Sequence, residues 1–263
     1  MPVLTLEDGG HLHYEVQGAG PPLLLVPGLG GLGSFCEPHV VSLAEKFTVV
    51  LHDHRGAGQS SLERIDFSVD QMAADVLRLM DHLGIERAHL VGHSTGGAIG
   101  QTIALDAPER LGSLVLSATW PRADHYFRLL FDSRAEILRQ LGPGAYQRAS
   151  ALFLWPPFWV RDHPEVAAID DGEAARRMPD PELVLRRIAA IQRFDRRVDL
   201  HRIAVPTLVV GAADDTVTPA WFSEDIGRLI PRAETVVLPR GGHFFPVTEA
   251  DAFRRLVLEF LTR

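Results

Sequence analysis

The sequence predicts an α/β fold, in which a mostly parallel sheet of eight strands has helices on both faces and a helical cap insertion. The first observation is a series of short apolar runs rich in β-branched residues, the pattern of strands buried on both faces. The second is that segments of helical periodicity separate these runs, as in sheets built with crossover helices. The third is one long stretch, residues 121–181, where the alternation stops. With 46% hydrophobic residues, the chain can bury a substantial core.

The first two strands form a predicted hairpin. The runs VLTL (3–6) and HLHYEV (11–16) flank EDGG, which is typical of a tight turn. Six further apolar runs predict the remaining strands. They are PLLLV (22–26), TVVLH (48–52), AHLVG (88–92), SLVLS (113–117), TLVVG (207–211) and ETVVL (234–238).

Helical periodicity appears between and after these strands. The main segments span residues 69–83, 96–111, 219–230 and 249–261. Because strand–helix–strand crossovers place strands parallel, we expect residues 1–120 and 182–263 to form one core domain. Residues 121–181 contain the helical pattern RLLFDSRAEILRQL and the aromatic cluster LFLWPPFW, without a convincing strand. We interpret this stretch as a helical cap, or lid, over the sheet.

Composition and net charge limit the kinds of binding partner and the cellular compartment that we expect for this protein. The formal net charge of −8 argues against nucleic acid or an anionic membrane surface as a partner. The start, MPVLTLEDGG, lacks the basic and apolar regions of a signal peptide, and no run approaches the ~20 apolar residues of a membrane span. We therefore expect a cytoplasmic protein that acts on a small molecule as a monomer or homodimer.

Three residues form a candidate catalytic set. Gly92-His93-Ser94-Thr95-Gly96 matches G-x-S-x-G between a predicted strand and a predicted helix, which is the context of a nucleophile elbow. A serine hydroxyl needs a base, and His243 follows the last predicted strand. Asp215, after the strand at 207–211, is the candidate acid that orients the histidine. All three follow strands, at the edge where open α/β sheets place their sites.

These motifs together resemble the α/β-hydrolase family over nearly the whole chain. The resemblance rests on PGLGG from Pro27, DHRGAGQS, GHSTGG, DDTVTP and GGHFFP, and on the chain order Ser, Asp, His. In the family the acid commonly stands four residues before the proline, which selects Asp215, and Asp214 stays an alternative. The resemblance also implies an oxyanion hole formed by the backbone N–H groups of Leu29 and Thr95, with no metal and no cofactor.

The glycines after the third strand allow a second interpretation. Gly28, Gly30 and Gly33 spell G-x-G-x-x-G, and Asp53 follows the next strand, as in a dinucleotide-binding domain. However, Pro27 separates the strand from the first glycine, and a hairpin precedes the motif, which fits a hydrolase better. We therefore interpret Asp53 as an organiser of its loop and expect no dinucleotide.

The expected activity is that of a serine esterase or lactonase in the carboxylic ester hydrolase class. Within the family, the chain is similar to aminoacrylate hydrolases and 3-oxoadipate enol-lactonases, which implies a small ester, lactone or related carbonyl substrate that carries a carboxylate. A general carboxylesterase is the alternative, and carbon–carbon bond hydrolases and perhydrolases use the same triad. A ligand-binding protein without catalysis is the alternative from another class.

Several other residues have both a functional and a structural interpretation. Four aromatic residues either line the substrate pocket or form the core of the insertion: Trp120, Trp155, Phe158 and Trp159. Arg122, Arg128 and Arg134 could bind a substrate carboxylate, but solvated surface is favoured for each because the chain is rich in arginine. His52, Asp53 and His54 lack a further ligand pattern, so no metal site is expected there. His93, beside Ser94, is interpreted as structural.

Overall fold

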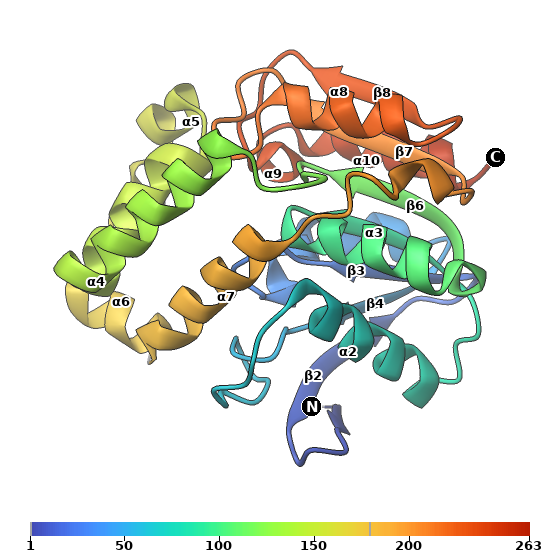
Figure 1. Ribbon diagram of the computed structural model, residues 1–263, viewed down its shortest axis with the longest axis horizontal. Helices are drawn as coiled ribbons and strands as arrows, with labels where there is room; N and C mark the ends of the chain where they lie inside the picture. Colours follow the sequence, from blue (N-terminus) through green and yellow to red (C-terminus); the bar gives the residue numbers. More distant parts are fainter. Residues whose placement is uncertain (1, 179) are drawn as a thin grey trace.

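The computed structural model, which describes residues 2–178 and 180–263, contains one eight-stranded sheet (Figure 1). The spatial order is β1-β2-β4-β3-β5-β6-β7-β8. The first two pairings, β1 with β2 and β2 with β4, are antiparallel, and the others are parallel. The strands are β1 (Val3–Thr5), β2 (His11–Gln17), β3 (Pro22–Val26), β4 (Thr48–His52), β5 (Ala88–His93), β6 (Leu111–Ser117), β7 (Thr207–Ala212) and β8 (Glu234–Leu238).

Every predicted strand run forms a strand, and the predicted hairpin is confirmed by the β1–β2 pairing. The central strands are buried on both faces, as their unbroken apolar runs require; all six residues of β7 are buried. Strand β8 differs, because it lies at the sheet edge and most of its residues are not buried. The predicted α/β class with a mostly parallel sheet is confirmed.

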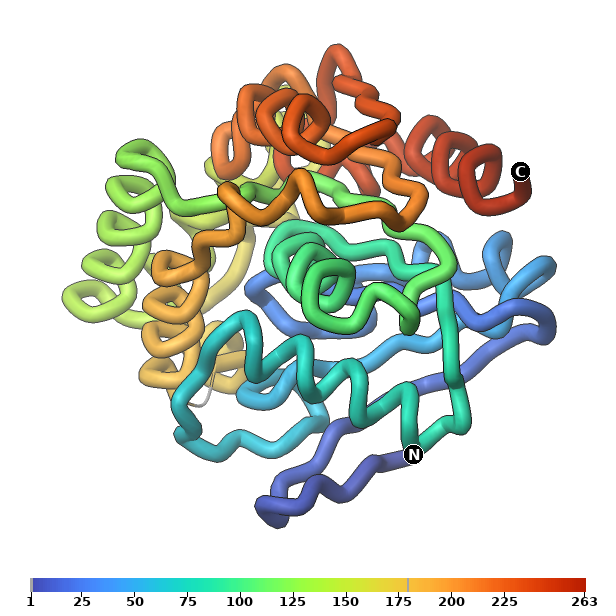
Figure 2. The backbone as a smooth tube through the Cα atoms, turned by 45° about the vertical axis from the view of Figure 1, so that its right-hand side comes forward, coloured from blue at the N-terminus to red at the C-terminus, as the bar shows by residue number. Residues whose placement is uncertain are grey.

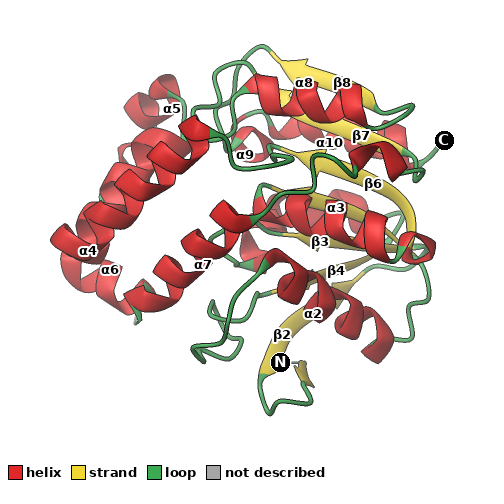
Figure 3. Cartoon of the chain, viewed as in Figure 1, coloured by secondary structure: helices red, strands yellow, loops and turns green. Residues whose placement is uncertain are grey.

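Helices cover both faces of the sheet (Figure 3). Alternate residues of one strand belong to different core clusters: Leu24 packs with α2, α3 and α8, whereas Leu23 packs with α1 and α10. These helices and their neighbours are α1 (Glu37–Ala44), α2 (Val69–His82), α3 (Thr95–Asp106), α8 (Ala220–Leu229), α9 (Phe245–Thr248) and α10 (Ala250–Leu261), with 3-10 turns η1 (Gly33–Cys36), η2 (Pro108–Arg110) and η4 (Leu200–Arg202). Helix α3 is buried along almost its whole length, so its first residue is held firmly.

The segment between β6 and β7 is helical and projects from one end of the sheet (Figures 1 and 2). Its elements are α4 (His125–Leu154), α5 (Pro157–Asp162), η3 (Pro164–Val166), α6 (Asp171–Arg177) and α7 (Pro181–Arg193). Helix α4 is kinked at Gly142, which has φ 78°, and Pro143 follows it. Helix α7 packs on α4, so the helical layer continues to Arg193, beyond the predicted end at residue 181.

None of the helices in the described ranges is both long enough and apolar enough to cross a membrane.

Candidate active site

Ser94 occupies a sharp turn between β5 and α3. Its backbone has φ 55° and ψ −114°, an unusual conformation for a residue with a side chain. The turn depends on its flanking glycines, because a Cβ at Gly92 would overlap the carbonyl oxygen of Gly96, and a Cβ at Gly96 would overlap that of Val26. The G-x-S-x-G pattern is thus explained by close backbone packing around Ser94.

The structure brings Ser94, His243 and Asp215 into one chain of hydrogen bonds. The Nε2 atom of His243 lies 3.0 Å from the Oγ atom of Ser94, and the Nδ1 atom lies 2.9 Å from the Oδ2 atom of Asp215. Ser94 is 6% exposed and His243 2% exposed, so the hydrogen-bonded side chains are buried. The serine hydroxyl can therefore donate to an imidazole whose other nitrogen donates to a carboxylate.

Asp215 and Asp214 have different hydrogen-bond partners. Asp215 also accepts hydrogen bonds from the backbone N–H groups of Val217 and Thr218 and from the Thr218 hydroxyl, at 2.7 to 2.9 Å. Burial alone would raise the pKa of Asp215, but the charge and hydrogen bond of His243 and the Thr218 donors hold it below its ordinary value. Asp214 instead accepts from the N–H of Gly242 at 2.8 Å. Of the two carboxylates, the structure places Asp215 on the imidazole.

Two backbone segments approach Ser94, namely those of Leu29 and Thr95, the residues predicted to form an oxyanion hole. Thr95 is the first residue of α3, where N–H groups have no acceptor within the helix. In the loop after β3, a Cβ at Gly28 would stand 3.1 Å from the Cβ of Ser94, and Leu29 is the next residue. The structure therefore places the segments of Leu29 and Thr95 next to the serine.

The loop after β4 fixes the loop that contains Leu29. The Nε2 atom of His54 is 3.1 Å from the carbonyl oxygen of Pro27, and the N–H of His54 donates to the carbonyl of Gly31 at 2.8 Å. Asp53 accepts from the N–H groups of Gly33 and Gln59, both at 2.9 Å, as expected of a loop organiser. Burial lowers the pKa of His54 well below its ordinary value, so the ring is neutral. Within residues 2–178 and 180–263, no three His, Cys, Asp or Glu side chains form a metal cluster.

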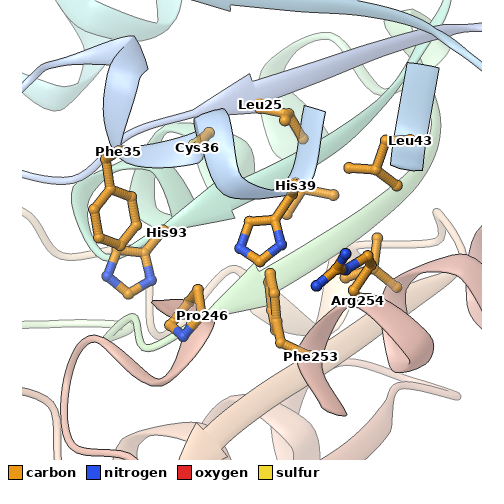
Figure 4. Close-up of a pocket in the computed structure, with 11 residues that line it drawn as sticks. Leu25, Phe35, Cys36, His39, Leu43, His93, Pro246, Phe253 and Arg254 are labelled. Atoms are coloured by element: carbon orange, nitrogen blue, oxygen red, sulfur yellow. The ribbon is translucent and has the colours of Figure 1, made fainter. Parts of the chain in front are cut away.

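His93 packs beside His243. It also borders a small apolar cavity (Figure 4). Its ring stacks on Phe35 with 4.7 Å between centroids and lies 5.0 Å from the ring of His243. Burial, with the nearby charge of His243, lowers the pKa of His93 well below its ordinary value. The cavity lies between the sheet and helices α1 and α10, and it includes Cys36, whose thiol has its pKa raised to about 12 by burial. His93 therefore supports the imidazole of His243 through packing.

The predicted pocket aromatics lie in different environments. Trp120 has no exposed surface and packs against Phe127, so it belongs to the hydrophobic core. Trp155 packs edge-on against Phe244, the neighbour of His243, and stacks on Trp159. The ring of Phe158 lies under the Arg240 guanidinium. Trp155 is thus the predicted aromatic that the structure brings next to the histidine segment.

The arginines differ from the sequence interpretation. Arg122 and Arg128 are exposed, but Arg134 is buried and donates from Nη2 to the hydroxyls of Tyr146 and Ser150, at 3.0 and 3.2 Å. The surface interpretation is wrong for Arg134, because its guanidinium lies over the rings of Phe131 and Tyr146 and the side chain is buried. Sequence analysis also missed Arg187, a buried side chain on α7 that contacts the loop of Gly31. The sequence does carry a pattern that indicates burial of Arg187. This arginine stands four residues after Leu183 and four before Ile191, which places it on the apolar face of a helix.

Known proteins resemble this chain in sequence and in fold. A curated relative from Azorhizobium caulinodans, named "Putative carbamate hydrolase RutD", is 39% identical over 249 residues, which cover 95% of this chain and 94% of the relative. The enol-lactonase from Burkholderia xenovorans LB400 superposes with a TM-score of 0.90 at 28% identity, covering 100% of both chains. A thermophilic esterase from Thermogutta terrifontis gives a TM-score of 0.86 at 28% identity, covering 99% of this chain and 97% of that one. The family model for the alpha/beta hydrolase fold matches residues 21–250, and the chain therefore belongs to the α/β-hydrolase family.

Proposed function

We propose that the protein is a serine hydrolase that cleaves a small ester, lactone or related acyl compound through an acyl-enzyme. The observation that carries the proposal is the continuous hydrogen-bond chain from the Oγ atom of Ser94 through His243 to Asp215. The strained backbone of Ser94 supports it further, because such conformations persist where the surrounding structure enforces them and they cluster at functional sites.

In the proposed reaction, the Oγ atom of Ser94 attacks the substrate carbonyl carbon while the Nε2 atom of His243 takes the hydroxyl proton. Asp215 fixes the imidazole tautomer through Nδ1 and stabilises the imidazolium charge. The negative oxygen of the tetrahedral intermediate accepts hydrogen bonds from the N–H groups of Leu29 and Thr95. His243 then protonates the leaving group, and a water molecule, activated by the same imidazole, releases the acid and restores Ser94.

The proposed substrate class follows from the family relatives as well as from the site. The names of the three relatives above, a carbamate hydrolase, an enol-lactonase and an esterase, all describe cleavage of a bond to an acyl carbon. These reactions share a need for a nucleophile, a base and donors for a negative oxygen, which are the roles proposed for Ser94, His243 and the N–H groups of Leu29 and Thr95. We propose a small substrate that carries a carboxylate, with a general carboxylesterase as the alternative.

The test is hydrolysis of 4-nitrophenyl esters of increasing acyl length by the wild type and by Ser94→Ala. We expect Ser94→Ala to lower kcat by at least about 10³-fold at unchanged stability, because the remaining site can polarise but not attack the carbonyl. Rates equal to those of Ser94→Ala for every ester, lactone and carbamate tried would refute catalysis through this serine. The acyl length with the highest kcat/KM reports how much room the site offers.

A further inference from the structure

Arg187 is a buried cation without an anionic partner in the part of the chain that the structure describes. Its side chain is 2% exposed, and its Nε and Nη2 atoms are buried without a hydrogen-bond acceptor. Burial lowers the pKa of Arg187 to about 10, and the described neighbour that opposes this shift is the Tyr146 phenol, not a carboxylate. The guanidinium thus keeps its charge at neutral pH.

The other buried arginines show how this protein normally accommodates such a charge. Arg55 forms two parallel hydrogen bonds to the carboxylate of Asp75, at 2.9 and 3.0 Å, and also pairs with Asp8. Arg134 donates to Tyr146 and Ser150. Removing a cation from water without such partners is strongly unfavourable, so a buried unpaired arginine indicates a partner from outside the chain.

The guanidinium lies against the loop that approaches the nucleophile. A Cβ at Gly31 would stand 2.9 Å from the Nη1 atom of Arg187. The N–H of Gly31 donates to the carbonyl of Gly28 at 2.9 Å, which closes a four-residue turn, and Gly28 is the glycine that contacts Ser94. The ends of such a turn are within about 7 Å of each other. Between them, a Cβ at Gly30 would meet no atom within 4 Å, so the turn borders open space.

We propose that Arg187 is the specificity-determining residue of this site and binds a carboxylate of the substrate, a few bonds from the carbonyl that Ser94 attacks. This inference rests on the proposed function. A carboxylate matches the planar fork of a guanidinium, whose parallel N–H groups bind both oxygens. Because Arg187 comes from helix α7 of the helical layer and Ser94 from the turn after β5, the substrate spans the helical layer and the edge of the sheet.

The test compares two esters that differ in one charge, mono-4-nitrophenyl glutarate and its methyl ester, on the wild type and on Arg187→Met. We expect Arg187→Met to lower kcat/KM for the half-ester about 10- to 100-fold, mainly through KM, and to change that for the methyl ester less than threefold. Arg186→Met is the matched control, because this neighbouring side chain is exposed and pairs with Glu182 on the same helix; it should leave both esters unaffected. Equal losses on both esters with Arg187→Met would overturn the proposal.

Thermal unfolding separates recognition from a structural role. A buried charge without a partner destabilises the folded protein, so Arg187→Met should have a Tm equal to or above that of the wild type; a lowered Tm would instead show a structural arginine. Added glutarate should raise the Tm of the wild type, of Arg186→Met and of Ser94→Ala, but not of Arg187→Met. If no ester is cleaved, the proposed function fails, while the glutarate shift still decides the role of Arg187. If esters are cleaved and glutarate shifts no Tm, the carboxylate site fails alone.

Discussion

Replacing Asp215 or Asp214 by asparagine removes the same charge from adjacent positions and should have very different effects. Asp215 lies 2.9 Å from the Nδ1 atom of His243, whereas Asp214 contacts only the backbone of Gly242 among these residues. At an effective dielectric constant of about 20, unit charges about 3–4 Å apart attract by about 4–6 kcal/mol, equal to about 10³- to 10⁴-fold in rate. An amide at position 215 would also place an N–H group toward Nδ1 and favour the tautomer with a proton on Nε2, which cannot accept the serine proton.

We therefore expect Asp215→Asn to lower kcat about 10³- to 10⁴-fold, measured with the best 4-nitrophenyl ester at pH 8. Asp214→Asn should change kcat less than about threefold, because the asparagine side-chain oxygen can still accept the hydrogen bond from Gly242. Thermal unfolding of both variants serves as the control for folding. A larger loss from Asp214→Asn, or more than a tenth of the activity remaining in Asp215→Asn, would refute this assignment of the acid.

Three further predictions concern stability and the elbow. Burial lowers the pKa values of His39 and His52 to about 4, and they return to about 6.5 on unfolding. Because the unfolded chain then binds more protons, the free energy of unfolding should fall by about 2 kcal/mol for each ring between pH 7 and pH 5. Urea unfolding of His39→Phe should therefore show a shallower pH dependence than that of the wild type. Gly96→Ala should lower kcat by at least about 10²-fold, because its Cβ would push against the Val26 carbonyl and displace Ser94. Gly30→Ala should be tolerated, because a Cβ at that position meets no atom within 4 Å. Arg55→Met should lower the free energy of unfolding by about 3–5 kcal/mol, because the buried Asp75 loses both hydrogen bonds from Arg55 and keeps Arg78, at 3.3 Å, as its one cationic partner among the described residues. Arg55→Met/Asp75→Leu should recover most of that loss in denaturant titrations.

The strands and the elbow could be predicted from sequence because their causes are local. A run such as TLVVG specifies a strand buried on both faces, and β7 forms there with every residue buried. Gly92 and Gly96 likewise flank Ser94 in the sequence, and they are the residues whose missing side chains allow the turn. Local patterns of this kind survive folding, because the neighbours that matter are neighbours in the chain.

The environment of each aromatic and arginine residue could not be predicted in the same way. Trp120 follows β6 at the strand end, where a pocket residue is equally plausible by pattern, but contacts from α4 bury it completely. Arg134 belongs to a helix whose charged residues mostly face water, and only the fold shows that it packs against Tyr146 across the kink at Gly142. Burial of these side chains depends on helices from distant parts of the chain.

The choice between Asp215 and Asp214 shows where a family pattern and a structure supply different information. Spacing from Pro219 favours Asp215, but spacing alone gives no reason why the neighbour could not serve. The structure supplies the reason: Asp215 has both oxygens occupied by donors from the Val217–Thr218 turn and His243, whereas Asp214 supports the loop that carries His243. The two adjacent carboxylates thus have different partners: Asp215 accepts a hydrogen bond from the imidazole, and Asp214 accepts one from the backbone that positions it. Arg187 adds a third position, because helix α7 places a charge beside the loop that approaches Ser94. Under the proposed function and the proposed role of Arg187, residues at the ends of the strands carry out attack on the acyl carbon, and helix α7 selects the substrate.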